Sequence, residues 1–331
     1  MAVIVTGAAG FIGMHVCERL LARGERVVGV DCFNSYYDVS LKEARAARLS
    51  GRPGFDMARI DVADVRAFEM LVQQVAPSRI VHLAAQAGVR YSLDNPFAYE
   101  RTNVAGQLSV LEACRHGPSV RHLVYASSSS VYGDRPLGGA GFREDDVLQP
   151  PASLYAATKR AGELMSDTYA HLFDLALTGL RFFTVYGPWG RPDMAYYSFT
   201  RKILAGEPIE VFGEGHMARD FTYIDDIVDG ITGVLDHPAA QGEHRIFNIG
   251  DSRPVGLMDM IAILEQSLGV EAVKRMRPMQ PGDVTATFAD IGRLNGLCDY
   301  APKVTLEAGL PRFVEWYRSF QRDSVGPMSP L

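Results

Sequence analysis

A glycine-rich turn at the start of the chain constrains its fold more than any other feature. A β-branched run at 2–6 leads into three glycines spaced G-x-x-G-x-x-G, rather than G-x-G-x-x-G, and a helical pattern follows at 15–23. Between a strand and a helix, such glycines permit a tight turn, close approach of backbone N–H groups to a pyrophosphate, and close packing of helix on strand. The turn therefore predicts a dinucleotide site with contacts from Gly7, Gly10, Phe11, Ile12 and Gly13.

Strand-like runs alternate with helical patterns through the first half of the chain. The runs lie at 2–6, 26–31, 55–61, 79–85 and 122–127. This alternation indicates βαβ units and a parallel sheet. Because the runs are nearly continuous apolar segments, helices should cover both faces of the sheet. We expect an α/β fold with a doubly wound parallel sheet of the Rossmann type.

The pattern changes after about residue 180, where glycine and proline become frequent and the strand-like runs become shorter. A chain of 331 residues also exceeds the size at which a single core usually stops growing. We therefore predict an NAD-type dinucleotide-binding domain at 1–180 and a smaller C-terminal α/β substrate lobe at 181–331. A segment at about 220–240 is expected to return to the first domain.

Composition narrows the set of partners. With 47% hydrophobic residues, 22% charged residues and a formal net charge of −6, nothing indicates nucleic acid or a membrane as a partner. No run reaches 18 apolar residues, and the first residues lack the basic region of a signal peptide. The four cysteines are far apart and the histidines form no ligand pattern. We expect no metal site, no disulfide framework and a cytoplasmic protein.

Two acidic residues stand where strands are predicted to end. Asp31 closes the second strand, where a carboxylate accepts a hydrogen bond from a ribose 2′-hydroxyl and repels a 2′-phosphate, which favours NAD over NADP. Asp61 and Val62 close the third strand and could meet the adenine. Asp61 could equally be the N-cap of the helix that follows.

A tyrosine and a lysine four residues apart form the candidate catalytic pair. Tyr155 and Lys159 fall within a helical pattern at about 153–173 and so share one helix face. A phenol with a pKa near 10 is protonated at neutral pH, and a neighbouring ammonium together with a positive nicotinamide favours the basic phenolate. The hydroxyl run 127–130 follows the fifth strand, at the sheet edge where such folds bind ligands. An exposed Tyr–Lys pair and a serine-rich capping turn are the structural alternatives.

Longer motifs connect these features to a known family. They comprise FNSYYDVSLK (33–42), HLAA (82–85), Asn103, RFFTVYGPWGRPDM (181–194) and MQPGDV (279–284). With the glycine turn, the serine run and the Tyr–Lys pair, they resemble the extended short-chain dehydrogenase/reductases, and within them the nucleotide-sugar epimerases and dehydratases. The long motifs look like those of the UDP-glucuronate 4-epimerases. The resemblance covers about residues 1–320.

The resemblance implies a mechanism. Tyr155 removes the proton of the sugar 4-hydroxyl while hydride passes from carbon 4 to tightly held NAD, and Ser128 hydrogen-bonds the same oxygen. Hydride then returns to the opposite face of the 4-keto sugar. UDP-glucuronate and UDP-galacturonate would interconvert without net redox change, with Lys159 as the charge that tunes the phenol.

The same resemblance implies binding residues. Further cofactor contacts would come from Asn34, Leu83, Ala84, Ala85 and Asn103, and contacts to the UDP portion from Val211, Phe212, Arg219 and Asp283. A guanidinium fork at 219 suits a pyrophosphate, although a salt bridge to Asp220, Asp225 or Asp226 is the alternative. Apolar faces near 97–116 and 155–173 could pair two subunits in a homodimer, or be buried within one subunit.

The residues after Ser128 bear on the choice of reaction. Related 4,6-dehydratases carry an acidic pair there, whereas this chain has Ser129 and Ser130, so dehydration is not expected. We hypothesise that both serines and Thr184 hold the uronate carboxylate by neutral hydrogen bonds, which prevents loss of carbon dioxide from the 4-keto intermediate. Arg191 is the alternative holder of the carboxylate.

Three other functions stay open. A UDP-glucuronate decarboxylase would share the substrate and the hydride step, but the two serines argue against it. Another UDP-sugar 4-epimerase is disfavoured for galactose because Gln280 stands where those enzymes carry arginine. A regulator that only senses NAD is disfavoured because Tyr155, Lys159 and Ser128 are all present.

Overall fold

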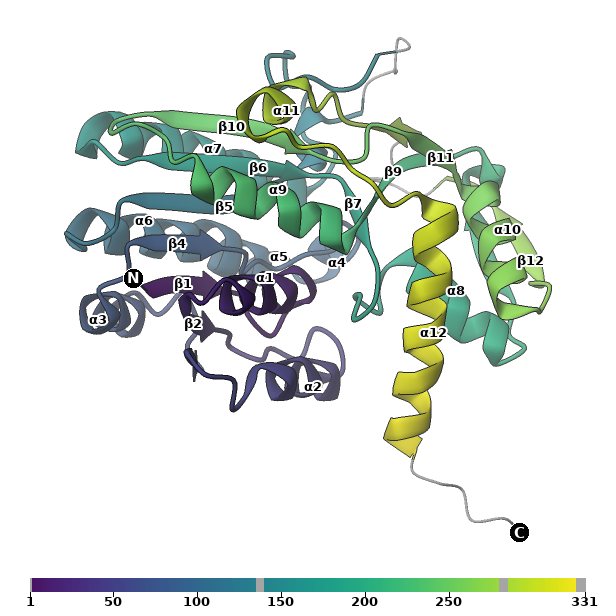
Figure 1. The fold of residues 1–331 in the computed structure, drawn as a ribbon. Coiled ribbons are helices and arrows are strands. Elements are labelled where there is room, and N and C mark those ends of the chain that lie inside the picture. The colour runs from purple at the N-terminus through teal and green to yellow at the C-terminus, as the bar shows by residue number, and fades with distance from the viewer. Residues whose placement is uncertain (1, 135–139, 280–284, 326–331) are drawn as a thin grey trace.

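A computed structural model describes residues 2–134, 140–279 and 285–325 of the chain (Figure 1). Its centre is a sheet of seven parallel strands in the order β10-β6-β5-β4-β1-β2-β3. These strands are β1 (Ala2–Thr6), β2 (Arg26–Val30), β3 (Phe55–Ala58), β4 (Arg79–His82), β5 (His122–Ser128), β6 (Leu177–Phe182) and β10 (His244–Ile249). The first five begin where the sequence predicts, although β3 and β4 each end three residues before the expected runs do. The doubly wound parallel sheet is confirmed.

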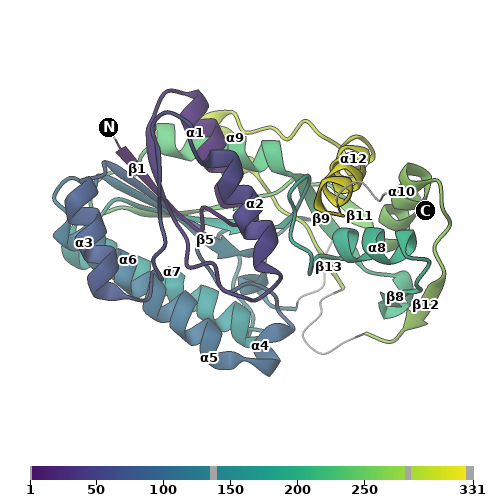
Figure 2. The same cartoon turned by 90° about the horizontal axis from the view of Figure 1, so that it is seen from below.

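Helices cover both faces of this sheet, as the apolar strands require. One face carries α3 (Val65–Val75), α6 (Gly106–His116) and α7 (Leu154–Phe173), which lie side by side in Figure 2. The other face carries α1 (Phe11–Ala22), α2 (Val39–Leu49) and α9 (Ile224–Asp236). Helix α11 (Gly292–Cys298) packs on α9 and β10. The strands between these layers are mostly buried, and their apolar side chains form much of the core.

A second lobe lies beside the carboxyl ends of the strands (Figures 1 and 2). Its strands are β7 (Thr184–Tyr186), β8 (Ile209–Phe212), β9 (Ala218–Tyr223), β11 (Pro254–Gly256), β12 (Lys274–Arg277) and β13 (Ala286–Thr287). Strand β9 pairs with β7, β11 and β13, while β8 pairs with β12. The helices of this lobe are α8 (Ala195–Leu204), α10 (Leu257–Leu268) and α12 (Leu306–Val325).

The chain crosses between the two lobes more than once. After β9 it returns to the large sheet, where α9 packs on α1 and β10 pairs with β6. The expected boundary at residue 180 lies inside β6. A division at this residue, with a return at about 220–240, stays a prediction.

Strand order fixes where ligands can bind. The order reverses between β1 and β4, and ligands of open α/β sheets bind outside the carboxyl ends of the strands at such a point. The glycine turn leaves β1 at this edge. The segment after β4 leaves the same edge and runs through α4 (Tyr91–Asp94), α5 (Pro96–Tyr99) and a π-helical stretch, Glu100–Ala105.

Candidate active site

A cavity of about 970 Å³ opens at this edge and is lined by both lobes. The large sheet contributes its strand ends, and the second lobe contributes Arg191, Phe212 and Arg219. The expected site residues that line it are Gly7, Gly10, Phe11, Ile12, Gly13, Asp31, Asn34, Asp61, Val62, Leu83, Ala84, Ala85, Ser128, Ser129, Ser130, Tyr155, Lys159, Thr184, Arg191, Phe212 and Arg219. Site residues from as far apart in the chain as Gly7 and Arg219 therefore line one cavity.

The glycine turn fits a dinucleotide. Gly7 adopts φ +70°, and a Cβ atom there would lie 2.9 Å from the amide nitrogen of Ala84. A Cβ on Gly13 would lie 2.0 Å from the carbonyl oxygen of Gly7. Helix α1 begins after Gly10 without a side-chain cap, so its first N–H groups face the cavity edge without competition from a cap. The turn can thus approach a pyrophosphate closely and favour its charge.

Two backbone N–H groups hold the carboxylate of Asp31 in place. One carboxylate oxygen accepts the N–H of Ala9 at 3.1 Å and the other accepts the N–H of Phe33 at 2.8 Å. An ionised carboxylate has about four acceptor positions, so a ribose hydroxyl can still donate to it. Lys42 lies behind, with Nζ 2.7 Å from Oδ1 of Asn34 and 3.9 Å from Asp31. This buried lysine lines the cavity and was not anticipated from sequence, because only the folding of α2 brings it to the strand end.

Asp61 and Val62 line the cavity, and Asp61 is not a helix cap. Helix α3 begins later and its N-cap is Asp64, whose side chain accepts the N–H of Ala67. The carboxylate of Asp61 accepts from Ala63 N–H at 2.9 Å and from Arg101 at 2.8 and 3.0 Å.

Two expected contacts lie behind the lining. Asn103 is buried in the π-helical stretch, where it accepts the N–H of Gln86 at 2.8 Å and donates to the carbonyl of Gln86 and the hydroxyl of Thr158. It ties the segment after β4 to α7. Val211 is fully buried because successive side chains of a strand point to opposite faces, which places Phe212 toward the cavity. The expected contact Asp283, like Gln280, lies outside the described residues.

Helix α7 presents Tyr155 and Lys159 to the cavity. Its N-cap is Ser153, whose side chain accepts the N–H of Ala156, so the helix begins just before the tyrosine. Burial raises the pKa of Tyr155 above its ordinary value, and the charge of Asp193 acts in the same direction. The Ser128 side chain and the charge of Arg191 lower the pKa but do not outweigh burial.

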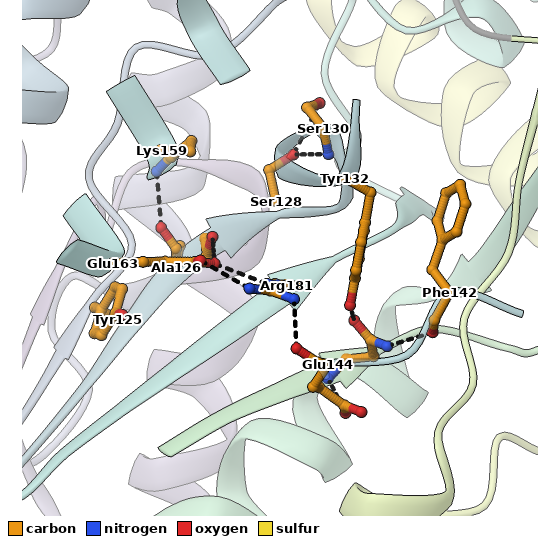
Figure 3. A network of polar contacts seen from close by, with 12 residues as sticks. Tyr125, Ala126, Ser128, Ser130, Tyr132, Phe142, Glu144, Lys159, Glu163 and Arg181 are labelled. Atoms are coloured by element: carbon orange, nitrogen blue, oxygen red, sulfur yellow. Dashed lines mark hydrogen bonds and ion pairs between the residues drawn. The ribbon is translucent and has the colours of Figure 1, made fainter. Parts of the chain in front are cut away.

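Lys159 is held differently from the expectation. Its ammonium donates to the carbonyl of Ala126 at 2.8 Å, and Figure 3 shows it pointing to this carbonyl. Burial lowers the pKa of Lys159 to about 8, against the raising influence of the Glu163 carboxylate. In this structure the cation that lowers the pKa of Tyr155 is Arg191. The role of Lys159 in tuning the phenol stays a prediction.

A buried ion pair fixes the position of α7 on the sheet. Glu163 accepts from Arg181 of β6 through both oxygens at 2.9 Å and from the hydroxyl of Ser127 at 2.6 Å (Figure 3). Since Ser127 lies between Ala126 and Ser128, the pair and the lysine together hold the end of β5 against α7. Breaking one partner of such a pair is strongly destabilising.

A second charged group comes from the loop before α8. Arg191 forms a two-pronged contact with Asp193 at 2.6 and 3.0 Å, and Tyr36 donates to Asp193 at 3.2 Å. Burial alone would raise the pKa of Asp193, but Arg191 outweighs burial and the pKa falls below its ordinary value. The guanidinium of Arg191 is therefore already occupied by a carboxylate.

The second lobe closes the far end of the cavity. Arg219 donates to the carbonyls of Ala218 and Thr285, while Asp220 points to the other side of β9 and accepts three backbone N–H groups. Asp226 accepts the N–H groups of residues 303 and 304. These two aspartates are thus engaged elsewhere, and Arg219 lines the cavity near Phe212.

Neither a metal centre nor a membrane helix is found in the part of the chain that the structure describes. No three or more His, Cys, Asp and Glu side chains gather there as metal ligands. None of the helices described combines the length and the apolar character needed to span a bilayer.

Comparison with known proteins places the chain in a family. The profile of the NAD dependent epimerase/dehydratase family matches residues 3–250, and the chain belongs to this family. UDP-glucuronate 4-epimerase 1 of Arabidopsis thaliana is 48% identical over 334 residues, covering 97% of this chain and 77% of that protein. UDP-glucuronic acid 4-epimerase from Bacillus cereus, solved with UDP-glucuronic acid and NAD, has a TM-score of 0.89 at 35% identity, covering 97% of this chain and 100% of that one.

The fold alone does not choose the reaction. DesIV of Streptomyces venezuelae, a dTDP-glucose 4,6-dehydratase solved with NAD and TYD, has a TM-score of 0.88 at 28% identity, covering 96% of this chain and 97% of that one. Two reactions therefore share one architecture, and the residues of the site must decide between them.

The buried ammonium of Lys159 predicts a stability effect. Its pKa is depressed, so the unfolded chain binds more protons than the folded one between about pH 8 and the ordinary lysine pKa. The protein carries the full cost of burying the charge below pH 8 and loses this cost as pH rises through that window. Lys159→Met should therefore be more stable than the wild type at pH 7 by roughly 1–3 kcal/mol.

Denaturant unfolding of both proteins at pH 7 and pH 10 measures this difference. The difference in unfolding free energy between the variant and the wild type should shrink toward zero at pH 10. A variant that is less stable than the wild type at pH 7, with no dependence on pH, would contradict a charged lysine in this position.

Proposed function

We propose that this protein is a UDP-glucuronate 4-epimerase, an isomerase that interconverts UDP-glucuronate and UDP-galacturonate. The observation that carries the proposal is a single cavity lined by the glycine turn, Tyr155 and Ser128. Its positions 129 and 130 are serines, where a dehydratase would carry acidic residues. Relatives with this function, and solved structures with UDP-glucuronic acid and NAD bound, support it.

The residues of the site divide the work of the reaction. The glycine turn and Asp31 would hold NAD, which would supply a reversible hydride acceptor for carbon 4. Tyr155 removes the proton of the 4-hydroxyl as hydride leaves carbon 4. It returns that proton to the same oxygen when hydride comes back to the opposite face of the 4-keto sugar. Ser128 hydrogen-bonds the same oxygen and orients the phenol. Burial raises the pKa of the phenol, and the charge of Arg191 acts in the opposite direction, against that of Asp193.

The uronate carboxylate meets the hydroxyl cluster in this proposal. Ser129, Ser130 and Thr184 all line the cavity with Tyr155, and Ser128 donates to the hydroxyl of Ser130 at 3.1 Å. Arg191 is the weaker candidate because Asp193 already occupies its fork. Neutral hydrogen bonds would fix the rotation of the carboxylate group. The bond between carbon 5 and the carboxylate would then not align with the π system of the 4-ketone, and decarboxylation would be suppressed.

The UDP portion occupies the second lobe in this proposal. Phe212 gives the uracil an apolar face, and the Arg219 guanidinium suits the pyrophosphate. Contacts from Asp283 complete the proposed set. Asn103 and Val211 support the site from behind its lining. The unpaired thiols of all four cysteines accord with a cytoplasmic enzyme, which we also propose.

Turnover of UDP-glucuronate with no added NAD tests the function. We expect UDP-galacturonate and no pentose, because tightly held NAD is restored in every cycle. Tyr155→Phe should lower the rate by about 10²–10⁴-fold, since it removes the proton acceptor. Release of carbon dioxide and a UDP-pentose would instead identify a decarboxylase. Retention of full activity by the phenylalanine variant would contradict the assigned base.

Product ratios test the role of the hydroxyl cluster. Thr184→Ala and Ser129→Ala should weaken UDP-glucuronate binding by about tenfold and raise the share of decarboxylated product, because each removes a hydrogen bond to a charged group. Ser267→Ala, which removes a hydroxyl bonded to the carbonyl of Ile263 on α10 away from the cavity lining, is the matched control and should change neither quantity. Unchanged affinity and product ratio in both site variants would contradict this role.

Exposed leucines on α6 and α7 bear on whether the protein forms a dimer. Leu108, Leu164 and Leu172 are 40%, 63% and 62% exposed on this pair of adjacent helices. Apolar side chains gathered in this way mark interaction surfaces, and a two-fold axis would bury the same patch on both subunits. We propose a homodimer through these helices.

Light scattering tests this proposal. Leu164→Glu should give a monomer, because it places a charge in the buried patch. Val273→Glu, at an exposed site in the second lobe, is the control and should stay a dimer. A wild-type protein that is already a monomer would contradict the proposal.

A further inference from the structure

Arg45 on α2 is a fully buried arginine whose partners are all neutral. Within the part of the chain that the structure describes, no carboxylate lies within ion-pair distance of its guanidinium. All five N–H donors are nevertheless used. Nε and Nη2 donate to the carbonyl of Trp189 at 3.1 and 2.6 Å, and Nη2 also donates to that of Gly190 at 2.9 Å. Nη1 donates to the carbonyl of Ala9 at 3.3 Å and to the hydroxyl of Tyr37 at 2.6 Å.

These acceptors belong to two separate parts of the site. Ala9 lies within the glycine turn, and its own N–H is bound by Asp31. Trp189 and Gly190 directly precede Arg191, whose charge acts on Tyr155. One side chain therefore joins the cofactor turn to the loop that sets the environment of the sugar and the catalytic phenol.

The loop needs such support because its backbone is strained. Trp189 adopts φ +64°, a conformation that is a genuine outlier for a bulky side chain and costs on the order of 1–3 kcal/mol. Its ring packs against Trp316 and Phe320, with centroids 5.2 and 5.3 Å apart, and Arg48 lies over it. The ring contacts hold the side chain, while Arg45 holds the carbonyl of the same residue.

Packing alone does not explain an arginine at this place. Burying a charge without a counter-ion is costly, and an apolar side chain of similar volume would join α2 to the loop at lower cost. A guanidinium differs in its rigid fork of donors, which fixes several acceptors at defined positions. The two carbonyls before Arg191 are the acceptors so fixed.

We infer that Arg45 is a positioning residue that couples the dinucleotide turn to the loop carrying Arg191 and Asp193, and so sets the affinity for the sugar portion of the substrate. The inference rests on the proposed function for the identity of that substrate. UDP alone, bound at Phe212 and Arg219, should depend little on Arg45. UDP-glucuronate, whose sugar reaches Tyr155, should depend on it strongly.

Tryptophan emission gives a readout of the loop that is independent of activity. The chain has two tryptophans. Trp316→Phe leaves Trp189 as the reporter, and the change should be tolerated because the buried Nε1–H of Trp316 has no acceptor. In this background and with NAD saturating, Arg45→Met should shift the emission of Trp189 to longer wavelength and increase its quenching by acrylamide, because the loop loses its anchor.

Binding measurements in the same proteins complete the test. Arg45→Met should weaken UDP-glucuronate binding by about tenfold while UDP binding changes less than twofold. Arg45→Lys keeps the charge but not the fork, so it should resemble the methionine variant; it also decides the matter if the methionine variant does not fold. Arg52→Met, just beyond α2 and paired with Glu18 alone among the residues that the structure describes, is the matched control.

Three outcomes overturn the inference. Full rescue by lysine would show that charge alone is needed. Unchanged emission and unchanged UDP-glucuronate affinity would show that Arg45 does not position the loop, and equal losses for UDP and UDP-glucuronate would indicate a general effect on folding. If the wild type makes no UDP-galacturonate, the proposed function fails, but the emission of Trp189 still reports on Arg45.

Discussion

Parallel pairing of seven strands is the constraint on which the site depends. Because every strand runs in the same direction, all carboxyl ends meet at one edge, and the reversal of order between β1 and β4 opens that edge to ligands. The glycine turn, the serine run and the segment after β4 are each a direct continuation of a strand. Helix α7 begins at the same edge, and its first turns bring a phenol and an ammonium to the cavity. The topology of the sheet therefore places the site, and the side chains at the strand ends supply its chemistry.

Burial of charge is the second theme of the structure. Lys159, the Glu163–Arg181 pair, the Arg191–Asp193 pair and Arg45 are all removed from most of the solvent, and each carries a desolvation cost that apolar residues would avoid. Lys159 and Arg191 line the cavity with Tyr155. Glu163 accepts from Ser127, which precedes Ser128, and Arg45 donates to Ala9 of the glycine turn. A low-dielectric site strengthens their influence on the phenol and fixes its geometry, so the cost in stability is coupled to catalysis.

Features encoded by neighbouring residues could be predicted from the sequence, and those that depend on distant partners could not. The strands, the turn around Gly7 and the shared face of Tyr155 and Lys159 follow from local periodicity and spacing. The links from Arg45 to Trp189 and from Tyr36 to Asp193 span more than 140 residues and leave no local signal. Strand alternation explains why Val211 lies in the core while the half-buried Phe212 lines the cavity. The folding of the π-helical stretch explains why Asn103 supports the site from behind.

Transfer of a hydride away from carbon 4 and back to the same carbon is the central claim of this account. It is tested most directly with UDP-glucuronate that carries deuterium at carbon 4, mixed with unlabelled substrate and incubated with the protein in ordinary water. The account predicts UDP-galacturonate that keeps its deuterium at carbon 4, without exchange into solvent or onto unlabelled molecules. Loss of the label to water, or its appearance on the unlabelled substrate, would contradict a hydride that leaves and returns within one site.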